Sequence, residues 1–151
     1  MTGTVVVDVV ESIVTILNAA TLSIPFVATR DYLHHYDRSD LEPIQVLVVP
    51  EILEVSAWDL RPRRSWDWGI AIWIDYLFEV GTDGQLDPTV IDPVMTLVQE
   101  VIDLFPPGDV PANTPNSRLI HAENEPVYDP EEFDQFRVFS TKVLLTFRTT
   151  R

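Results

Sequence analysis

One cluster in the chain has the residue types that bind metal ions, and it consists of Asp31, His34, His35, Asp37 and Asp40. Imidazole and carboxylate groups are common zinc ligands. Successive side chains on a strand point to opposite faces, however, so adjacent histidines reach one ion only across a special turn. The third histidine, His121, is distant in sequence. The pattern therefore favours loop histidines beside a solvated acidic turn, and we expect no metal site.

Paired carboxylates suited to acid and base catalysis occur in the acidic segment 123–136. Such catalysis needs two carboxyl groups around a cleft with well-separated pKa values. The chain has only five glycines and contains no nucleophile elbow, P-loop or dinucleotide-binding glycine motif. We therefore expect no catalytic residues and no cofactor, and we hold a small carboxylate hydrolase only as an alternative.

Basic residues are scarce, yet three of them lie together at Arg61, Arg63 and Arg64. One interpretation is protection of the edge of the next strand, because charge and proline discourage unwanted strand pairing. The other is a docking patch for an acidic neighbour, including another copy of this chain. Both interpretations stay open at the level of sequence.

The alternating segment 66–76 predicts a strand with one buried face. Its even positions are all apolar, whereas its odd positions include two aspartates, a glycine and an alanine. Trp73 falls on the face opposite Trp66 and Trp68. We expect it to pack under a helix or in a subunit interface, where aromatic residues are enriched.

Further elements follow from apolar spacing and from proline and glycine positions. Helical periodicity predicts helices over 5–19 and 93–105, the second starting at the Asp92-Pro93 pair rather than at Asp87-Pro88. Shorter apolar runs predict strands over 26–33, 45–49 and 138–148, with Pro50 ending the second, and a weaker strand pattern covers 53–61. The proline-rich segment 106–117 is expected to form a loop or an exposed arm.

These elements predict one small α+β domain over residues 1–151. Its mixed or antiparallel sheet should have about four to five strands, with the two amphipathic helices covering one face. We expect that face to contain Trp66, Trp68, Ile70, Ile72, Ile74, Phe139, Val143 and Leu145.

The composition is acidic, with ten Lys and Arg against 24 Asp and Glu and a formal net charge of −14. Affinity for a phosphate backbone comes from Lys and Arg that displace counterions, so the chain is a poor candidate for gripping DNA. No apolar run approaches the ~20 residues of a membrane span, and no cysteine is present for disulfides or thiolate ligands.

The order of the predicted elements resembles the phage tail-terminator family, also called tail-completion or minor tail protein U-like. The matching segments are the 5–19 helix, Arg30-Asp31-Tyr32, Val46-Leu-Val-Val-Pro50, Ile70-Ala-Ile-Trp-Ile74, the 93–105 helix and Val143-Leu-Leu-Thr-Phe147. The linker 81–92 and the segment 123–136 are long for a minimal member of that family.

The resemblance implies a structural virion protein that forms a ring, typically a hexamer, at the head-proximal end of a tail tube. Its partners would be other copies of itself, the tail tube protein and the head connector or neck protein. DNA would pass through the lumen without specific binding, which agrees with the acidity. The interface candidates are Arg61, Arg63, Arg64 and Trp73.

The main alternative belongs to a different class of protein. A chain this acidic also suits an inhibitor that imitates DNA and occupies a basic groove on a host protein. Such an inhibitor needs no closed ring, so the state of assembly discriminates between the two.

Overall fold

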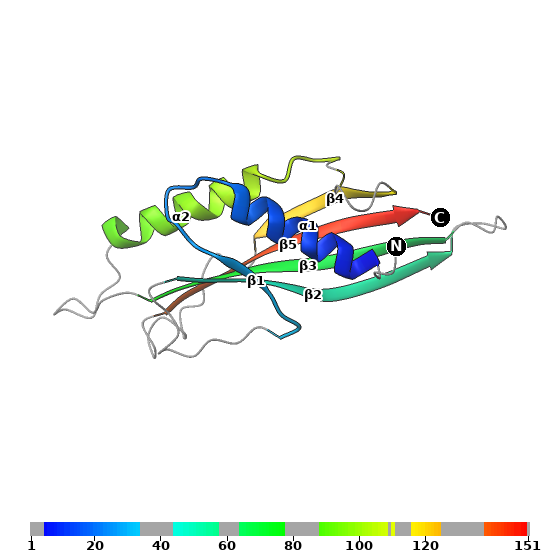
Figure 1. The fold of residues 1–151 in the computed structure, drawn as a ribbon, viewed down its shortest axis with the longest axis horizontal. Coiled ribbons are helices and arrows are strands. Elements are labelled where there is room, and N and C mark those ends of the chain that lie inside the picture. Colours follow the sequence, from blue (N-terminus) through cyan, green and yellow to red (C-terminus); the bar gives the residue numbers. More distant parts are fainter. Residues whose placement is uncertain are drawn as a thin grey trace.

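The strand expected over 66–76 forms the middle of the sheet. In the computed structural model, which describes residues 5–33, 44–57, 64–77, 88–108, 110, 116–124 and 138–150, this strand spans Arg64–Leu77 and is labelled β3. The other described elements are α1 (Val5–Ala19), β1 (Ala28–Arg30), β2 (Ile44–Ala57), α2 (Pro88–Asp103), β4 (Ser117–Asn124) and β5 (Val138–Thr150). The strand order is β1-β2-β3-β5-β4 (Figure 1).

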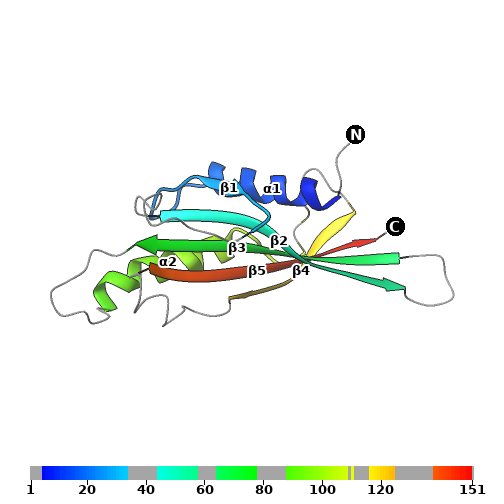
Figure 2. The same cartoon turned by 90° about the horizontal axis from the view of Figure 1, so that it is seen from below.

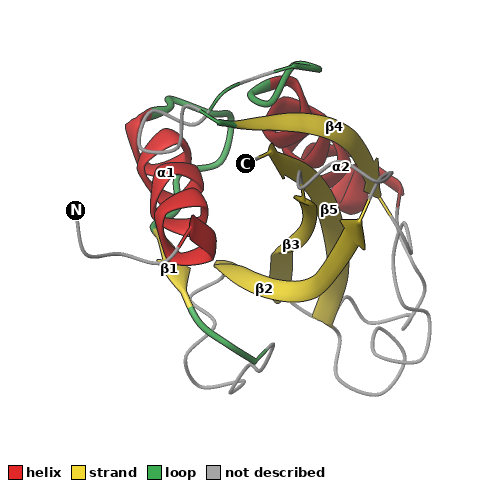
Figure 3. Cartoon of the chain, turned by 90° about the vertical axis from the view of Figure 1, so that its right-hand side faces the viewer, coloured by secondary structure: helices red, strands yellow, loops and turns green. Residues whose placement is uncertain are grey.

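The sheet is mixed, because β1 pairs with β2 in parallel whereas every other neighbouring pair is antiparallel. The long strands β2, β3 and β5 run along most of the molecule (Figure 2). Seen end-on, the sheet is twisted and curved, with α1 on its concave side (Figure 3). The structure thus confirms the predicted α+β class with a small mixed sheet.

Both helices pack on one face of the sheet, as predicted. Cross-strand pairs on that face include Ile70 with Leu145 and Ile72 with Val143, and all four side chains are fully buried. The apolar stripes of both helices join the same buried cluster, through residues such as Ile13 of α1. In Figure 1 the two helices lie together above the sheet. Trp66 and Trp68, expected in this core, lie only half-buried toward one end of β3.

The prediction that Pro50 ends a strand was wrong, because β2 continues through Pro50 to Ala57. The Asp31 N–H donates to the Val48 carbonyl at 3.1 Å, so Val48 directs its backbone polar groups toward β1. Pro50 lies two residues further along β2, so its backbone nitrogen is directed to the same side as that of Val48. At Pro50 the pairing with β1 has already ended. Its missing N–H therefore costs no ladder bond, and the register shift between Pro50 and Ile52 absorbs the irregularity.

The predicted start of the second helix was also wrong, because α2 begins at Pro88 and carries Pro93 inside it. The buried stripe extends one turn further back than expected, since Ile91 is packed against Val94 and Phe139. The burial of Ile91 outweighs the loss of one backbone hydrogen bond, because proline at position 93 has no N–H to donate to the Thr89 carbonyl. At the other end, Leu104 and Phe105 donate to carbonyls three residues earlier, so the last turn tightens.

The remaining boundaries differ modestly from expectation. The helix predicted over 5–19 is α1, with the same bounds. The strand expected over 26–33 is limited to the three residues of β1, and that expected over 138–148 extends to Thr150. The segment 106–117 is anchored where it begins, because the Gly108 N–H donates to the Leu119 carbonyl at 2.9 Å. Gly108 has a φ of 81°, a conformation that glycine adopts without strain.

Candidate subunit interface

Most of the residues that suggested chemistry lie outside the described part of the chain. These are His34, His35, Asp37 and Asp40 of the metal candidate, Arg61 and Arg63 of the basic patch, and residues 125–136 of the acidic segment. Arg64 begins β3, where its backbone pairs with Ala57. A role for these residues in an interface therefore stays a prediction.

The described members of those clusters have structural partners. The Asp31 carboxylate accepts a hydrogen bond from the Tyr32 N–H at 2.7 Å. His121 is exposed on β4, with its Nε2 3.5 Å from a carboxylate oxygen of Glu123. Among the described residues, no group of three His, Cys, Asp or Glu side chains is placed to hold a metal ion. No helix of the described part is both long and apolar enough to cross a membrane.

Trp73 lies on the sheet face opposite the helices, in register with Leu47 and Lys142. Its indole N–H donates to the Glu51 carboxylate at 3.0 Å. The Lys142 ammonium lies 5.4 Å from the indole ring centroid and 3.3 Å from the same carboxylate. The expectation that Trp73 packs under a helix is thus not met by either described helix, and its role in an interface stays a prediction.

A second charge pair on that face joins Asp67 and Arg148, which are opposite each other on β3 and β5. Two parallel bonds of 2.9 and 3.0 Å connect the guanidinium to the carboxylate. Hydrogen bonding and the charge of Asp67 raise the pKa of Arg148 above its ordinary value, against a small opposing effect of burial. In these two pairs on the face opposite the helices, each charge is therefore compensated within the chain.

The helix layer has the opposite character, because its ionisable residues are all acidic. Asp8 and Glu11 lie on α1, and Asp92, Glu100 and Asp103 lie on α2, while neither helix contains a lysine or an arginine. The described basic residues all belong to strands: Arg30, Arg64, Arg118, Lys142 and Arg148. Among the described residues, net negative charge is therefore concentrated on the two helices, where Arg30 of β1 pairs with Glu11.

One edge of the sheet, formed by β1, is closed to strand addition at its first residue by an asparagine. The Ala28 N–H donates to the Asn18 side-chain oxygen at 2.7 Å, and the Asn18 amide donates back to the Ala28 carbonyl at 3.1 Å. The Asn18 side chain thus takes the place of a further strand, a protection that sheet edges need.

Just beyond β1, two large side chains project into solvent. Tyr32 is 63% exposed and Leu33 is 72% exposed, whereas most large apolar side chains in the described part of the chain are buried or half-buried. We call them the Tyr32–Leu33 pair. Val27, just before β1, is 76% exposed, so exposed apolar side chains flank β1 on both sides.

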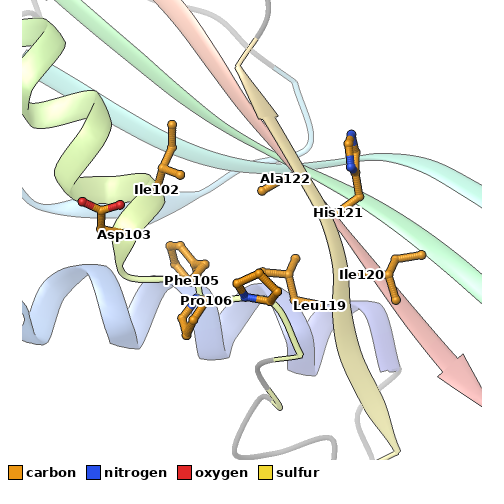
Figure 4. A pocket seen from close by; sticks show the side chains of 9 residues that line it. Ile102, Asp103, Phe105, Pro106, Leu119, Ile120, His121 and Ala122 are labelled. Carbon is orange, nitrogen blue, oxygen red and sulfur yellow. The ribbon is translucent and has the colours of Figure 1, made fainter.

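The opposite edge of the sheet, formed by β4, borders a groove. The groove has a volume of about 480 Å³ and lies between the C-terminal end of α2 and β4 (Figure 4). Its apolar lining includes Ile102, Phe105, Pro106, Leu119, Ile120 and Ala122. Asp103 and His121 add polar groups to it. Ile120 is 39% exposed at the point where β4 shifts register against β5. We call this the α2–β4 groove.

Sequence reasoning placed Phe105 on the apolar stripe of the second helix but missed the groove itself. The groove depends on the chain returning from α2 to β4 through Gly108, and on the bulge that turns Ile120 outward. The visible signals are the Pro106-Pro107-Gly108 stop and two consecutive apolar residues, Leu119 and Ile120, inside a strand. Neither signal specifies where the strand packs.

No protein-family model matches the chain, and no curated protein matches it significantly in sequence.

Proposed function

We propose that this protein is a structural virion protein, a tail terminator that forms a ring at the head-proximal end of a phage tail tube. The observation that carries the proposal is the separation of charge between the two layers. Among the described residues, the charged side chains of both helices are all carboxylates, whereas on the opposite face Asp67 pairs with Arg148 and Glu51 pairs with Lys142.

A ring that passes DNA needs a channel wall to which the duplex does not adhere. Carboxylates offer a polyanion no gain from counterion release, so DNA slides past them. We therefore orient the helix layer toward the channel. The two edges of the sheet then face the neighbouring subunits on either side.

The sheet edges suit such an arrangement because they differ from each other. The β1 edge presents the exposed Tyr32–Leu33 pair, and the β4 edge presents the α2–β4 groove. Two different surfaces on one protomer give a head-to-tail contact, which forms a ring when the rotation between copies closes. A hexamer is the expected number, as the resemblance to tail terminators implies.

An acidic inhibitor that imitates DNA is the second candidate, and the same acidic helix layer favours it. The two functions differ in whether the protein must associate with other copies of itself. A terminator assembles at tube ends beside the tube and neck proteins of the virion, whereas an inhibitor acts as a single chain on a basic partner.

The deciding experiment measures the mass of the purified protein by light scattering and images it by negative stain, with and without assembled tail tubes. We expect closed rings, either free or located at tube ends. A protein that stays monomeric and leaves tube ends bare would overturn the terminator proposal and favour the inhibitor.

A further inference from the structure

We infer that Arg118 of one copy binds the carboxylate of Asp92 in the next copy. This inference rests on the proposed ring and names an ion pair that fixes how neighbouring copies align. The ligand of Arg118 is a carboxylate, and the molecule that supplies it is a second copy of this chain.

The first argument is that Arg118 has no acidic partner in its own chain. Its side chain is exposed on β4, and it makes no hydrogen bond or ion pair within the described part of the structure. The other lysine and arginine side chains that the structure describes each pair with a carboxylate, in the pairs Arg30–Glu11, Lys142–Glu51 and Arg148–Asp67.

The second argument is the charge beside Arg118. Leu119 and Phe147 belong to the core, so Arg118 and Arg148, which are opposite each other in the register, lie on the other face of the sheet. Like charges directly opposite on neighbouring strands repel each other. Arg148 binds Asp67 through Nε and Nη2. Two guanidinium groups and one carboxylate leave one positive charge, which a single further carboxylate neutralises.

A carboxylate suits this site because a guanidinium presents its donors in a planar fork that matches two carboxylate oxygens. A phosphate group matches the same fork. Affinity for a nucleic acid, however, requires several Lys and Arg that displace counterions together, and this site has one uncompensated charge. The site therefore favours a side chain of another protein molecule.

The third argument is that Asp92 has the complementary property. Its side chain is exposed on α2 and has no partner in the described part of the chain, since only its backbone carbonyl accepts a bond, from the Thr96 hydroxyl at 3.0 Å. The other helix carboxylates are half-buried or have partners: Asp8 is half-buried, Glu11 pairs with Arg30, Glu100 accepts from Ser23 and Asp103 accepts from Gln99.

The fourth argument is the distance between the two groups in one copy. Ile91, next to Asp92, packs against Phe139 at the start of β5. Arg118 instead lies opposite Arg148, near the end of β5. At about 3.4 Å per residue these two positions on β5 are roughly 30 Å apart. In Figure 1, α2 begins at the left of the molecule, whereas β5 ends at the right beside the C-terminus.

One copy therefore cannot join its own Asp92 to its own Arg118, whereas a head-to-tail series of copies joins every such pair. A series of this kind forms a ring when the rotation between copies closes. Since Arg118 lies on β4, the contact is at an edge of the sheet that the proposed ring turns toward a neighbour. An ion pair in this position supplies register and direction more than affinity.

The test is a charge swap, followed by light-scattering mass in the presence of tail tubes. Arg118→Glu and Asp92→Arg each place like charges together at the contact. We expect each single variant to need at least roughly tenfold more protein for half-maximal ring formation. The double variant Arg118→Glu with Asp92→Arg restores opposite charges and should recover the wild-type value.

Two features of the design control for other effects. Asp92→Arg lowers the net negative charge of each copy, so a loss of rings in this variant cannot come from general repulsion. Arg118→Lys keeps the positive charge and, as the matched control, should assemble close to wild type. Both positions are exposed, so every variant is expected to fold, which circular dichroism and a melting curve verify.

The outcomes separate this inference from the proposed function. Single variants that assemble like wild type, or a double variant that stays as weak as they are, would overturn the ion pair while leaving the terminator intact. Binding of duplex DNA that Arg118→Glu abolishes would assign the site to phosphate and overturn the ion pair as well. A wild-type chain that forms no ring with or without tubes would overturn the terminator and this contact together.

Discussion

Single side chains at the centre of the sheet decide whether the chain folds. Ile72 is fully buried, and it lies opposite Val143 beneath both helices. Its surroundings are apolar side chains, so a carboxylate there has no partner. Burying an unpaired charge costs several kcal/mol, an amount comparable to the whole stability of about 5–15 kcal/mol expected for a domain.

We therefore expect Ile72→Asp to yield no soluble folded protein. The matched control, Ile72→Val, removes one methyl group and should cost only about 0.5–1.5 kcal/mol. Soluble yield and thermal unfolding measure both variants. A soluble Ile72→Asp protein that unfolds cooperatively would show that the register of β3 is wrong.

Elements were predictable from sequence where periodicity and burial agree. The helix over 5–19 and the alternation of β3 are such cases, because each buries one regular face. The two errors both concern proline. At Pro50 a local rule predicts the end of a strand, and at Pro93 it predicts the start of a helix. The open side of β2 overrides the first rule, and tertiary burial overrides the second. Neither effect can be inferred from a short stretch of the sequence, because both depend on residues distant along the chain.

The cost of Pro93 gives a prediction at the scale of the helix. Replacing it by alanine restores a backbone N–H for the Thr89 carbonyl inside α2, where proline is about 3 kcal/mol less favourable than alanine. Alanine also leaves the unfolded chain more conformational freedom than proline does, and this reduces the gain in folding free energy by up to about 1 kcal/mol. We expect Pro93→Ala to raise the melting temperature by several degrees, and by more than Thr96→Ala on the same exposed face. An unchanged or lower melting temperature would mean that α2 needs proline at position 93.

At the scale of the whole molecule, assembly has to overcome repulsion between copies. Each copy carries a formal charge of −14, and exposed charges more than about 8–10 Å apart are screened at ordinary ionic strength. The two edge surfaces of the proposed ring, the Tyr32–Leu33 pair and the α2–β4 groove, are mainly apolar, so salt should weaken the repulsion more than it weakens the contact between copies.

We therefore expect the ring fraction, measured by light scattering at fixed protein concentration, to rise as sodium chloride is increased from low to physiological concentration. A net-neutral solute such as sucrose at equal osmolality controls for general exclusion effects. Dissociation of rings by salt would instead indicate an interface dominated by opposite charges, such as the patch at Arg61, Arg63 and Arg64.

The candidate site was less predictable than the fold. The acidity and the scarcity of basic residues are visible in the composition, whereas their separation into layers requires knowing that both helices share one face. The groove needs the spatial meeting of α2 and β4, which are joined through a proline-rich segment. Tyr32 was visible as part of Arg30-Asp31-Tyr32, but its exposure depends on β1 ending at Arg30.

The bond pattern at Asn18 also exposes the molecule to chemical ageing. Hydrolysis of the Asn18 amide, with release of ammonia, leaves a carboxylate that accepts hydrogen bonds but donates none. The Ala28 N–H would keep its partner, whereas the Ala28 carbonyl would face a negative oxygen at the position where an amide donated at 3.1 Å. Deamidation of this one side chain would therefore loosen the β1 edge.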